Sequence, residues 1–284
     1  MASEATRVYE RVVDDRSLVV LGDQSYLEAL REQARATGGA IDESKGMLLI
    51  TGPGRHPIYN YAVRTDPSLD AREAFARAEL HFSELGFGFT VVTMNAFDDS
   101  SMGEAARAKG LAALVSPPAM FCTRKLDSKP APPGIRLEPV RDAAGLAAFR
   151  DVSMVAWATY GIAEDVTAAI FTRMSMVAAE HITAIVAYDG SMGLSCALVL
   201  MSHGIGGVYW VGTAPDGRGR GLAEACTRAV TNIGFDAGAR MVTLQASPMG
   251  DPIYRRMGYR QVGSYTLYFA TPPRDAGGGG SARP

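Results

Sequence analysis

Apolar residues in the second half of the chain alternate between short strand-like runs and helical spacings. Residues 208–211 are all strand formers, and an amphipathic helical segment begins near Gly219. The turn between them contains Pro215 and Gly217. The sequence therefore predicts a strand, a glycine-rich turn and a helix over residues 208–225, and the remaining segments are interpreted around this unit.

The glycine-rich turn places unpaired backbone amides at the start of the predicted helix. The first N–H groups of a helix have no intrahelical partner, and glycine lets a ligand approach them without a Cβ in the way. Arg218 and Arg220 add positive charge beside the partial positive charge of the helix end. The expected ligand is a phosphate or a pyrophosphate.

The spacing of the turn excludes the two commonest nucleotide-binding motifs. A Walker loop requires GxxxxGK[ST], and the chain contains no Lys-Ser or Lys-Thr pair. The dinucleotide fingerprint requires GxGxxG, whereas Gly217, Gly219 and Gly221 occupy alternate positions. The turn fits the pattern Arg-x-x-Gly-x-Ala instead, at Arg218, Gly221 and Ala223.

A second segment follows at a suitable distance. Residues 241–259 contain a strand, a short helix and the sequence Tyr254-x-x-x-Gly258-Tyr259, in that order. Tyr254 alone favours a tyrosine that packs in the core, and the Gly-Tyr pair four residues later reverses that preference. Together with the Arg-x-x-Gly-x-Ala turn, this order resembles the acetyl-CoA-binding region of the GNAT acyltransferase superfamily.

The resemblance covers residues 135–270 well and residues 45–120 faintly. It implies an α/β (α+β) fold with two tandem GNAT-like domains, each a mixed, mostly antiparallel sheet flanked by helices. The expected divisions are a degenerate domain at 1–124, a linker at 125–134, an acetyltransferase domain at 135–272 and a flexible tail at 273–284.

The first domain repeats part of the same plan without a glycine-rich loop. Where that loop should lie, residues 64–70 contain no glycine and two carboxylates, which would repel a pyrophosphate. Asp98 and Asp99 are interpreted as capping residues of a following helix. The elements predicted here are helix 24–37, strands 47–50 and 59–63, helix 70–85, strand 87–94 and helix 102–109.

The second domain is predicted to begin after the proline-rich linker. Its expected elements are strand 135–139, helices 142–158 and 164–179, a hairpin of strands 182–188 and 192–201, and a last strand at 264–270 that closes the domain.

The resemblance also implies where acetyl-CoA would bind. The sheet would open between the strand that precedes the glycine-rich turn and the strand at 241–246. The pantetheine arm would bond to strand backbone there, as a partner strand does. A serine, Ser247, stands near the pantetheine, where many family members have Asn. The backbone groups expected to hold the ligand are those of Val211, Gly212, Thr213, Arg218, Gly219, Arg220, Gly221, Leu222 and Ala223.

Acyl transfer from a thioester requires a proton for the departing thiolate. Tyr254 suits this role, because a phenol with a pKa of ~10 stays protonated at neutral pH. The general base is unassigned, since residues 205–214 contain no carboxylate where many family members have one. His203 is a candidate base by residue type, although a lone turn histidine is more often a surface residue. A water relay, or deprotonation of the amine before binding, would also suffice.

The acceptor site is expected between the first two helices of the second domain. Trp157, Tyr160 and Gly161 lie there, and they would wall a pocket if exposed or belong to the core if buried. The predicted activity is transfer of an acetyl group from acetyl-CoA to a primary amine of a small molecule or peptide, by direct attack in a ternary complex. The alternatives are a non-catalytic acyl-CoA-binding regulatory module and an interaction scaffold.

The amino-acid composition mainly excludes other classes of protein. The hydrophobic fraction of 47% predicts a globular core, and the net charge of -2 argues against nucleic-acid binding. Cys122, Cys196 and Cys226 predict neither a disulfide framework nor a metal site. No signal-peptide or membrane-spanning run is evident, so a cytoplasmic protein without a membrane partner is expected. The oligomeric state, a homodimer included, is left open.

Overall fold

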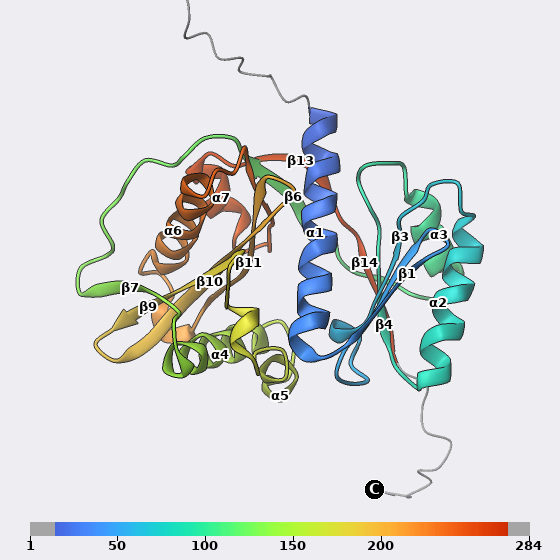
Figure 1. Ribbon diagram of the computed structural model, residues 1–284, viewed down its shortest axis with the longest axis horizontal. Helices are drawn as coiled ribbons and strands as arrows, with labels where there is room; N and C mark the ends of the chain where they lie inside the picture. Colours follow the sequence, from blue (N-terminus) through green and yellow to red (C-terminus); the bar gives the residue numbers. More distant parts are fainter. Residues whose placement is uncertain (1–14, 272–284) are drawn as a thin grey trace, which may run out of the picture.

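Two β-sheets lie side by side, with one long helix between them (Figure 1). The computed structural model describes residues 15–271, so the predicted flexible tail at 273–284 lies outside the described residues. Helix α1 (Asp15–Thr37) is longer than the predicted helix 24–37. None of the helices within residues 15–271 combines the length and apolarity needed to cross a bilayer.

The first half of the chain follows the predicted order of strands and helices and adds three strands. The strands β1, β5 and β6 were not predicted, because β1 and β5 are short and exposed and β6 begins at a proline. The elements are β1 (Ala40–Ser44), β2 (Met47–Thr51), β3 (Tyr61–Arg64), α2 (Ala71–Leu85), β4 (Phe89–Val92), α3 (Ser100–Ala108), β5 (Ala113–Val115) and β6 (Pro118–Cys122).

In the second half one predicted helix is shorter, and the strands at Ala178–Ala179 and Arg260–Ser264 were not predicted. The helix predicted at 164–179 ends at Ala168, because the chain then turns to bury Ile170 and Phe171 and forms β8 (Ala178–Ala179). The other elements are β7 (Ile135–Pro139), α4 (Ala143–Ala158), α5 (Glu164–Ala168), β9 (Ile182–Asp189), β10 (Met192–Ser202), β11 (Ile205–Thr213), α6 (Leu222–Asp236), β12 (Val242–Gln245), α7 (Asp251–Met257), β13 (Arg260–Ser264) and β14 (Leu267–Ala270).

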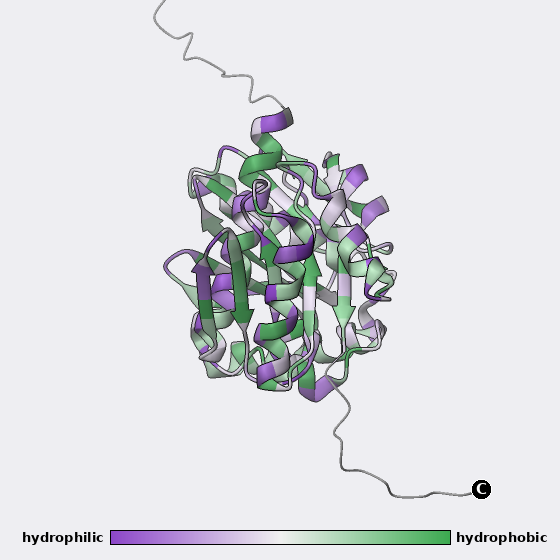
Figure 2. Cartoon of the chain, turned by 90° about the vertical axis from the view of Figure 1, so that its right-hand side faces the viewer, coloured by the Kyte–Doolittle hydropathy of each residue, from purple (hydrophilic) through white to green (hydrophobic). Residues whose placement is uncertain are grey.

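Both sheets are mixed and mostly antiparallel, as predicted. The first has the strand order β1-β2-β3-β4-β14-β5, and the second has the order β13-β6-β12-β11-β10-β9-β7. Each contains one parallel pair, β3 with β4 and β11 with β12. Apolar residues gather in the strands, whereas the helices also carry polar residues (Figure 2). The expected α/β class with two GNAT-like sheets is confirmed.

The two halves exchange one strand each. Strand β6, from the first half, lies between β12 and β13, and β14, from the end of the second half, lies between β4 and β5. The prediction that strand 264–270 closes the second domain is therefore wrong. Tyr268 of β14 is 2% exposed in the core of the first sheet, and its hydroxyl accepts a hydrogen bond from Arg107 at 2.8 Å. The predicted boundaries at 124 and 135 stay predictions, since strands of both sheets cross them.

Helix α1 contacts both sheets and fixes the start of β11. Leu30 and Ala34 belong to the core that the first sheet buries, and Leu18 packs with Phe121 on the second sheet. A Cβ on Gly207 of β11 would lie 2.4 Å from the Tyr209 ring and 2.5 Å from the Ser25 Oγ, so glycine allows these side chains to pack against the strand.

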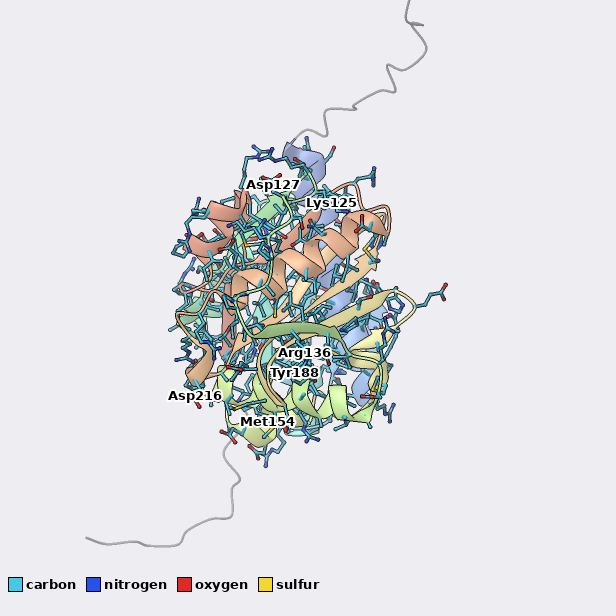
Figure 3. The ribbon with its side chains drawn as sticks, turned by 90° about the vertical axis from the view of Figure 1, so that its left-hand side faces the viewer. Lys125, Asp127, Arg136, Met154, Tyr188 and Asp216 are labelled. Atoms are coloured by element: carbon cyan, nitrogen blue, oxygen red, sulfur yellow. The ribbon has the colours of Figure 1, made fainter. Side chains whose placement is uncertain are left out.

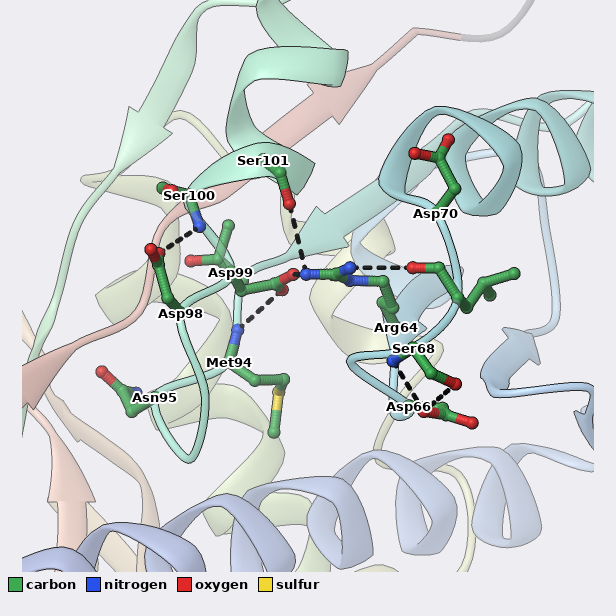
Figure 4. Close-up of polar contacts among 12 residues, drawn as sticks. Arg64, Asp66, Ser68, Asp70, Met94, Asn95, Asp98, Asp99, Ser100 and Ser101 are labelled. Carbon is green, nitrogen blue, oxygen red and sulfur yellow. Dashed lines mark hydrogen bonds and ion pairs between the residues drawn. The ribbon is translucent and has the colours of Figure 1, made fainter.

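In the first sheet a buried ion pair lies next to the end of the parallel strand pair (Figure 4). Strands β3 and β4 pair only as far as Val63 and Val92. The next residue, Arg64, donates from Nε to the Asp99 Oδ1 at 2.8 Å and from Nη1 to the Leu69 carbonyl at 2.9 Å. Both members of the ion pair are at least nine-tenths buried.

The capping role predicted for Asp98 and Asp99 holds for only one of them. The Asp98 Oδ1 accepts a hydrogen bond from the Ser100 amide at 3.0 Å. The Asp99 side chain makes no cap hydrogen bond to its helix; its Oδ2 accepts from the Met94 amide at 3.1 Å. Burial raises the pKa of Asp99, and the hydrogen bonds from Arg64 and Met94 oppose that rise.

We expect Asp99→Asn to lower the free energy of unfolding by about 3–5 kcal/mol, because it leaves the Arg64 guanidinium buried without a countercharge. Chemical denaturation measures this change. Asp98→Asn is the matched control, since it removes the neighbouring exposed carboxylate and should change stability little. Equal stability of Asp99→Asn and the wild type would contradict this role of the ion pair.

Candidate functional site

The second sheet opens between its two parallel strands. Strand β11 pairs with β12 at only three positions, Gly206 to Val208 against Val242 to Leu244. It then continues to Thr213, and within residues 15–271 no strand pairs with that edge of β11 beyond Val208. The predicted opening is therefore present, and it exposes one edge of strand backbone.

A β-bulge redirects β11 where the opening begins. Tyr209 pairs with Leu198 and Gly212 with Cys196, so Trp210 and Val211 together face a single residue of β10. Trp210 has a φ of 52°, which is rare for a bulky side chain. The sequence pattern of β11 gave no sign of this left-handed tryptophan.

The far end of β11 is tightly covered on one side. A Cβ on Gly212 would lie 3.0 Å from the Ala156 Cβ of α4, so glycine allows the helix to pack there. The Ser195 hydroxyl donates to the Gly212 carbonyl at 2.8 Å and lies 2.9 Å from the Thr213 Oγ1. Contacts of Val211, Gly212 and Thr213 with pantetheine remain predictions.

The turn after β11 presents three unpaired amides in succession. The Arg218 amide donates to the Pro215 carbonyl at 3.2 Å, so it is used within the turn. Gly219 and Gly221 have φ values of 73° and 76°, a left-handed conformation that favours glycine. Within the described chain, the amides of Gly219, Arg220 and Gly221 have no hydrogen-bond acceptor. A short run of such amides is typical of an anion-binding backbone concavity.

The helix that follows begins without a side-chain cap. Gly221 is the N-cap of α6, and Leu222 and Ala223 are its first two residues. Leu222 is 1% exposed in the core and anchors the helix start. The first backbone N–H groups of α6, which have no acceptor within the helix, can therefore bind a ligand together with the amides of the turn.

The two predicted arginines differ in their partners. Arg220 forms an ion pair with Asp189 at the end of β9, at 2.7 Å. Arg218 is exposed and has no ion-pair partner among residues 15–271. Arg218 is thus the uncommitted cation of the turn.

Tyr254 lies on α7 within the core, next to the Gly250 backbone. It is 6% exposed, and a Cβ on Gly250 would meet its ring at 2.7 Å. Burial raises the pKa of Tyr254, and the nearby Thr227 hydroxyl opposes that rise. The phenol therefore stays protonated at neutral pH, as the predicted role requires.

Ser247 stabilises the turn that leads into α7. Its Oγ accepts a hydrogen bond from the Gly250 amide at 3.1 Å, and its carbonyl accepts from Asp251 at 2.9 Å. Ser247 makes no hydrogen bond as a hydroxyl donor within residues 15–271, so contact with a ligand amide stays a prediction.

Aromatic rings line the side of β11 opposite to α6. Trp157 packs against Trp210 with ring centroids 4.9 Å apart, and against Tyr160 at 5.8 Å. Tyr160 is 46% exposed, whereas Trp157 is half-buried. Tyr160 is therefore a candidate wall for an acceptor, and Trp157 belongs partly to the core.

One contact from the first half of the chain reaches this region. The Tyr59 hydroxyl donates to the Val166 carbonyl of α5 at 2.7 Å and holds this short helix in place. Such a contact joins residues 107 positions apart, and no local pattern could indicate it.

Two further sequence expectations concern the base and metals. His203 lies in the turn before β11, seven residues before Trp210, which is about 20 Å along an extended strand. The structure does not bring it to the opening. Within residues 15–271, no group of three His, Cys, Asp or Glu side chains is placed to hold a metal ion.

Comparison with known proteins finds a family match for the region that contains the opening. Residues 172–262 match the model described as the acetyltransferase (GNAT) domain. This match contains β11, the glycine-rich turn, α6, β12 and α7. No curated protein sequence matches the chain.

Solved structures match nearly the whole length. A GCN5-related N-acetyltransferase from Kribbella flavida is 17% identical, with a TM-score of 0.66 over 88% of this chain and 97% of that chain. A GCN5-related N-acetyltransferase from Sphaerobacter thermophilus is 16% identical, with a TM-score of 0.58 over 88% and 92%. A tandem GNAT protein from the clavulanic acid biosynthesis pathway is 13% identical, with a TM-score of 0.52 over 90% and 97%.

These likenesses extend across both sheets and include a tandem protein, so the shared fold is not limited to the matched residues. Residues 172–262 match the acetyltransferase (GNAT) domain, and the chain around them shares the fold of solved GCN5-related N-acetyltransferases.

Proposed function

We propose that this protein is an acetyl-CoA-dependent N-acetyltransferase that acts on a primary amine of a small molecule or peptide. The observation that carries the proposal is the open edge of β11, which leads directly into the unpaired amides of Gly219, Arg220 and Gly221. The family assignment supports acyltransferase activity in general. A cytoplasmic protein without nucleic-acid or membrane partners fits this proposal.

Acetyl-CoA would bind in two parts. The pantetheine arm would lie along the unpaired edge of β11 at residues 209–213 and would form strand-like hydrogen bonds. The pyrophosphate would accept hydrogen bonds from the turn amides and the first turn of α6, with Arg218 supplying the uncommitted positive charge.

The reaction would be a direct attack within a ternary complex. The neutral amine nitrogen forms a bond to the thioester carbonyl carbon, and collapse of the tetrahedral intermediate breaks the C–S bond. Tyr254 gives its proton to the departing thiolate, and the phenolate recovers a proton from the attacking nitrogen through solvent. Burial raises the pKa of Tyr254, so the phenol carries the proton that the thiolate needs at neutral pH. No net proton is produced.

The acceptor would enter beside the exposed ring of Tyr160. On this side of the site Trp157 contacts both Tyr160 and Trp210, so an amine attached to an apolar or aromatic group would gain contact area there. No carboxylate lies on β11 from Ile205 to Thr213, so a protein side chain on that strand would not deprotonate the amine.

Arg218→Glu should weaken acetyl-CoA binding at least about tenfold, because it replaces a charge-assisted contact to phosphate with a repulsion. Titration calorimetry measures the affinity. The matched control is Arg240→Glu, which makes the same charge change at an exposed arginine beside His203, at the other end of β11. An unchanged affinity in Arg218→Glu would refute the assignment of the turn.

Tyr254→Phe should lower kcat about 10²-fold or more while leaving acetyl-CoA affinity nearly unchanged, because it removes only the proton donor. Thiol release across a panel of primary amines measures turnover, and calorimetry measures binding on the same sample. Equal turnover in both forms would remove Tyr254 from the mechanism.

The same thiol assay distinguishes the enzyme from a regulatory acyl-CoA-binding module. Acetyl-CoA binding with amine-dependent thiol release supports the enzyme. Binding at one site per chain without release on any amine would contradict it and favour the regulatory module.

A further inference from the structure

A second positively charged region lies on the outer face of α6, away from the sheet. The segment between β6 and β7, residues 123–134, crosses this face (Figure 3). It is fixed to the helix, because the Leu126 amide donates to the Asn232 Oδ1 at 2.9 Å and the Asn232 Nδ2 donates back to the Leu126 carbonyl at 3.1 Å. The predicted linker is therefore a strap on α6.

Two adjoining cavities lie beneath this strap. The larger, of about 330 Å³, extends along α6 from Gly221 to Asn232, and the smaller, of about 170 Å³, reaches the end of α7 at Gly258. Lys129 and Arg228 line both. A phosphate group with part of the molecule that carries it fits a space of this size.

The cavities carry an excess of positive charge. Five cationic side chains line the cavities, those of Arg124, Lys125, Lys129, Arg228 and Arg256. Three carboxylates line the cavities or pair with these cations, those of Asp127, Glu224 and Asp236. Two positive charges are therefore left without a countercharge.

Arg228 is the buried member of this group, with 8% of its surface exposed. Its Nη1 donates to the Asp127 carbonyl at 2.9 Å and its Nη2 to Glu224 at 2.7 Å. Its Nε is buried and has no acceptor among the described residues. A buried donor without a partner is costly, and a buried guanidinium favours an anion nearby.

The remaining donors face the smaller cavity from two elements. Arg124 follows β6, and Arg256 lies in the last turn of α7. Neither guanidinium has an ion-pair partner within residues 15–271. Two uncommitted arginines that line one cavity from different elements are suited to bidentate contacts with phosphate oxygens.

We propose that the space between the strap and the outer face of α6 binds a phosphate monoester. Arg124 and Arg256 contact the phosphate oxygens, and Arg228 supplies buried positive charge beside them. The larger cavity reaches Gly221, but the phosphate contacts lie apart from the glycine-rich turn, because Arg228 lies seven residues after Gly221, which is about 10 Å along the helix axis. The phosphate comes either from a free phosphorylated compound or from the 3′-phosphate of a CoA bound at the turn.

Only the second source, the 3′-phosphate of CoA, rests on the proposed function.

The first arm of the test is calorimetry with inorganic phosphate, on the full chain and on the double variant Arg124→Gln/Arg256→Gln. We expect the double variant to bind phosphate about tenfold or more weakly, because it removes two charge-assisted contacts. Arg150→Gln is the control, since Arg150 is an arginine of α4 that lines neither cavity and pairs with Asp151.

The second arm compares acetyl-CoA with 3′-dephospho-acetyl-CoA. If the 3′-phosphate occupies the site, the wild type prefers acetyl-CoA about tenfold or more and the double variant loses this preference. Thermal melting of each variant checks that it is folded.

The outcomes show which of the two sources supplies the phosphate. Phosphate binding that the double variant weakens establishes a site for a free compound, and a preference for acetyl-CoA that the double variant loses establishes the 3′-phosphate site. Absence of both effects, or phosphate binding that the double variant leaves unchanged, overturns the proposal. If neither CoA form binds, the proposed function fails separately, and the inorganic phosphate arm alone decides the inference.

Discussion

The parting of β11 from β12 is the constraint on which the candidate site depends. Two parallel strands that stay paired would satisfy each other's backbone groups and leave no room for a ligand. Here the pairing stops after Val208, while β11 continues to Thr213 on the support of β10. Helix α1 holds the paired end across Gly207. The strand edge, the turn amides and the start of α6 are thus presented together on one rigid strand.

The first half has the same strand arrangement but fills the corresponding place with protein. Beyond Val63 the side chain of Arg64 turns to Asp99, and both are buried next to the end of the parallel pair. A pantetheine arm would have to displace a charged, hydrogen-bonded pair. The same fold therefore supports a binding edge in one half and a structural core in the other, and the exchanged strands β6 and β14 tie the two halves together.

The order of residue types along the chain was enough to predict the elements whose formation depends on neighbouring residues. The strand, turn and helix at 208–225 follow from strand formers, alternating glycines and an amphipathic run, and the structure places them accordingly. The exchange of β6 and β14 could not be predicted, because a short apolar strand satisfies either sheet and the choice depends on distant partners such as Arg107. The left-handed Trp210 and the distance of His203 from the opening are also consequences of tertiary structure.

Hydrogen–deuterium exchange of backbone amides, with and without acetyl-CoA, shows whether the ligand occupies the open edge of β11. This placement of the ligand predicts slower exchange at residues 209–213 and 219–223, because the ligand would bond to the open edge of β11 and to the turn, with no change at β3 and β4. Slower exchange around Arg64 and β4, or no change at residues 209–223, would contradict it.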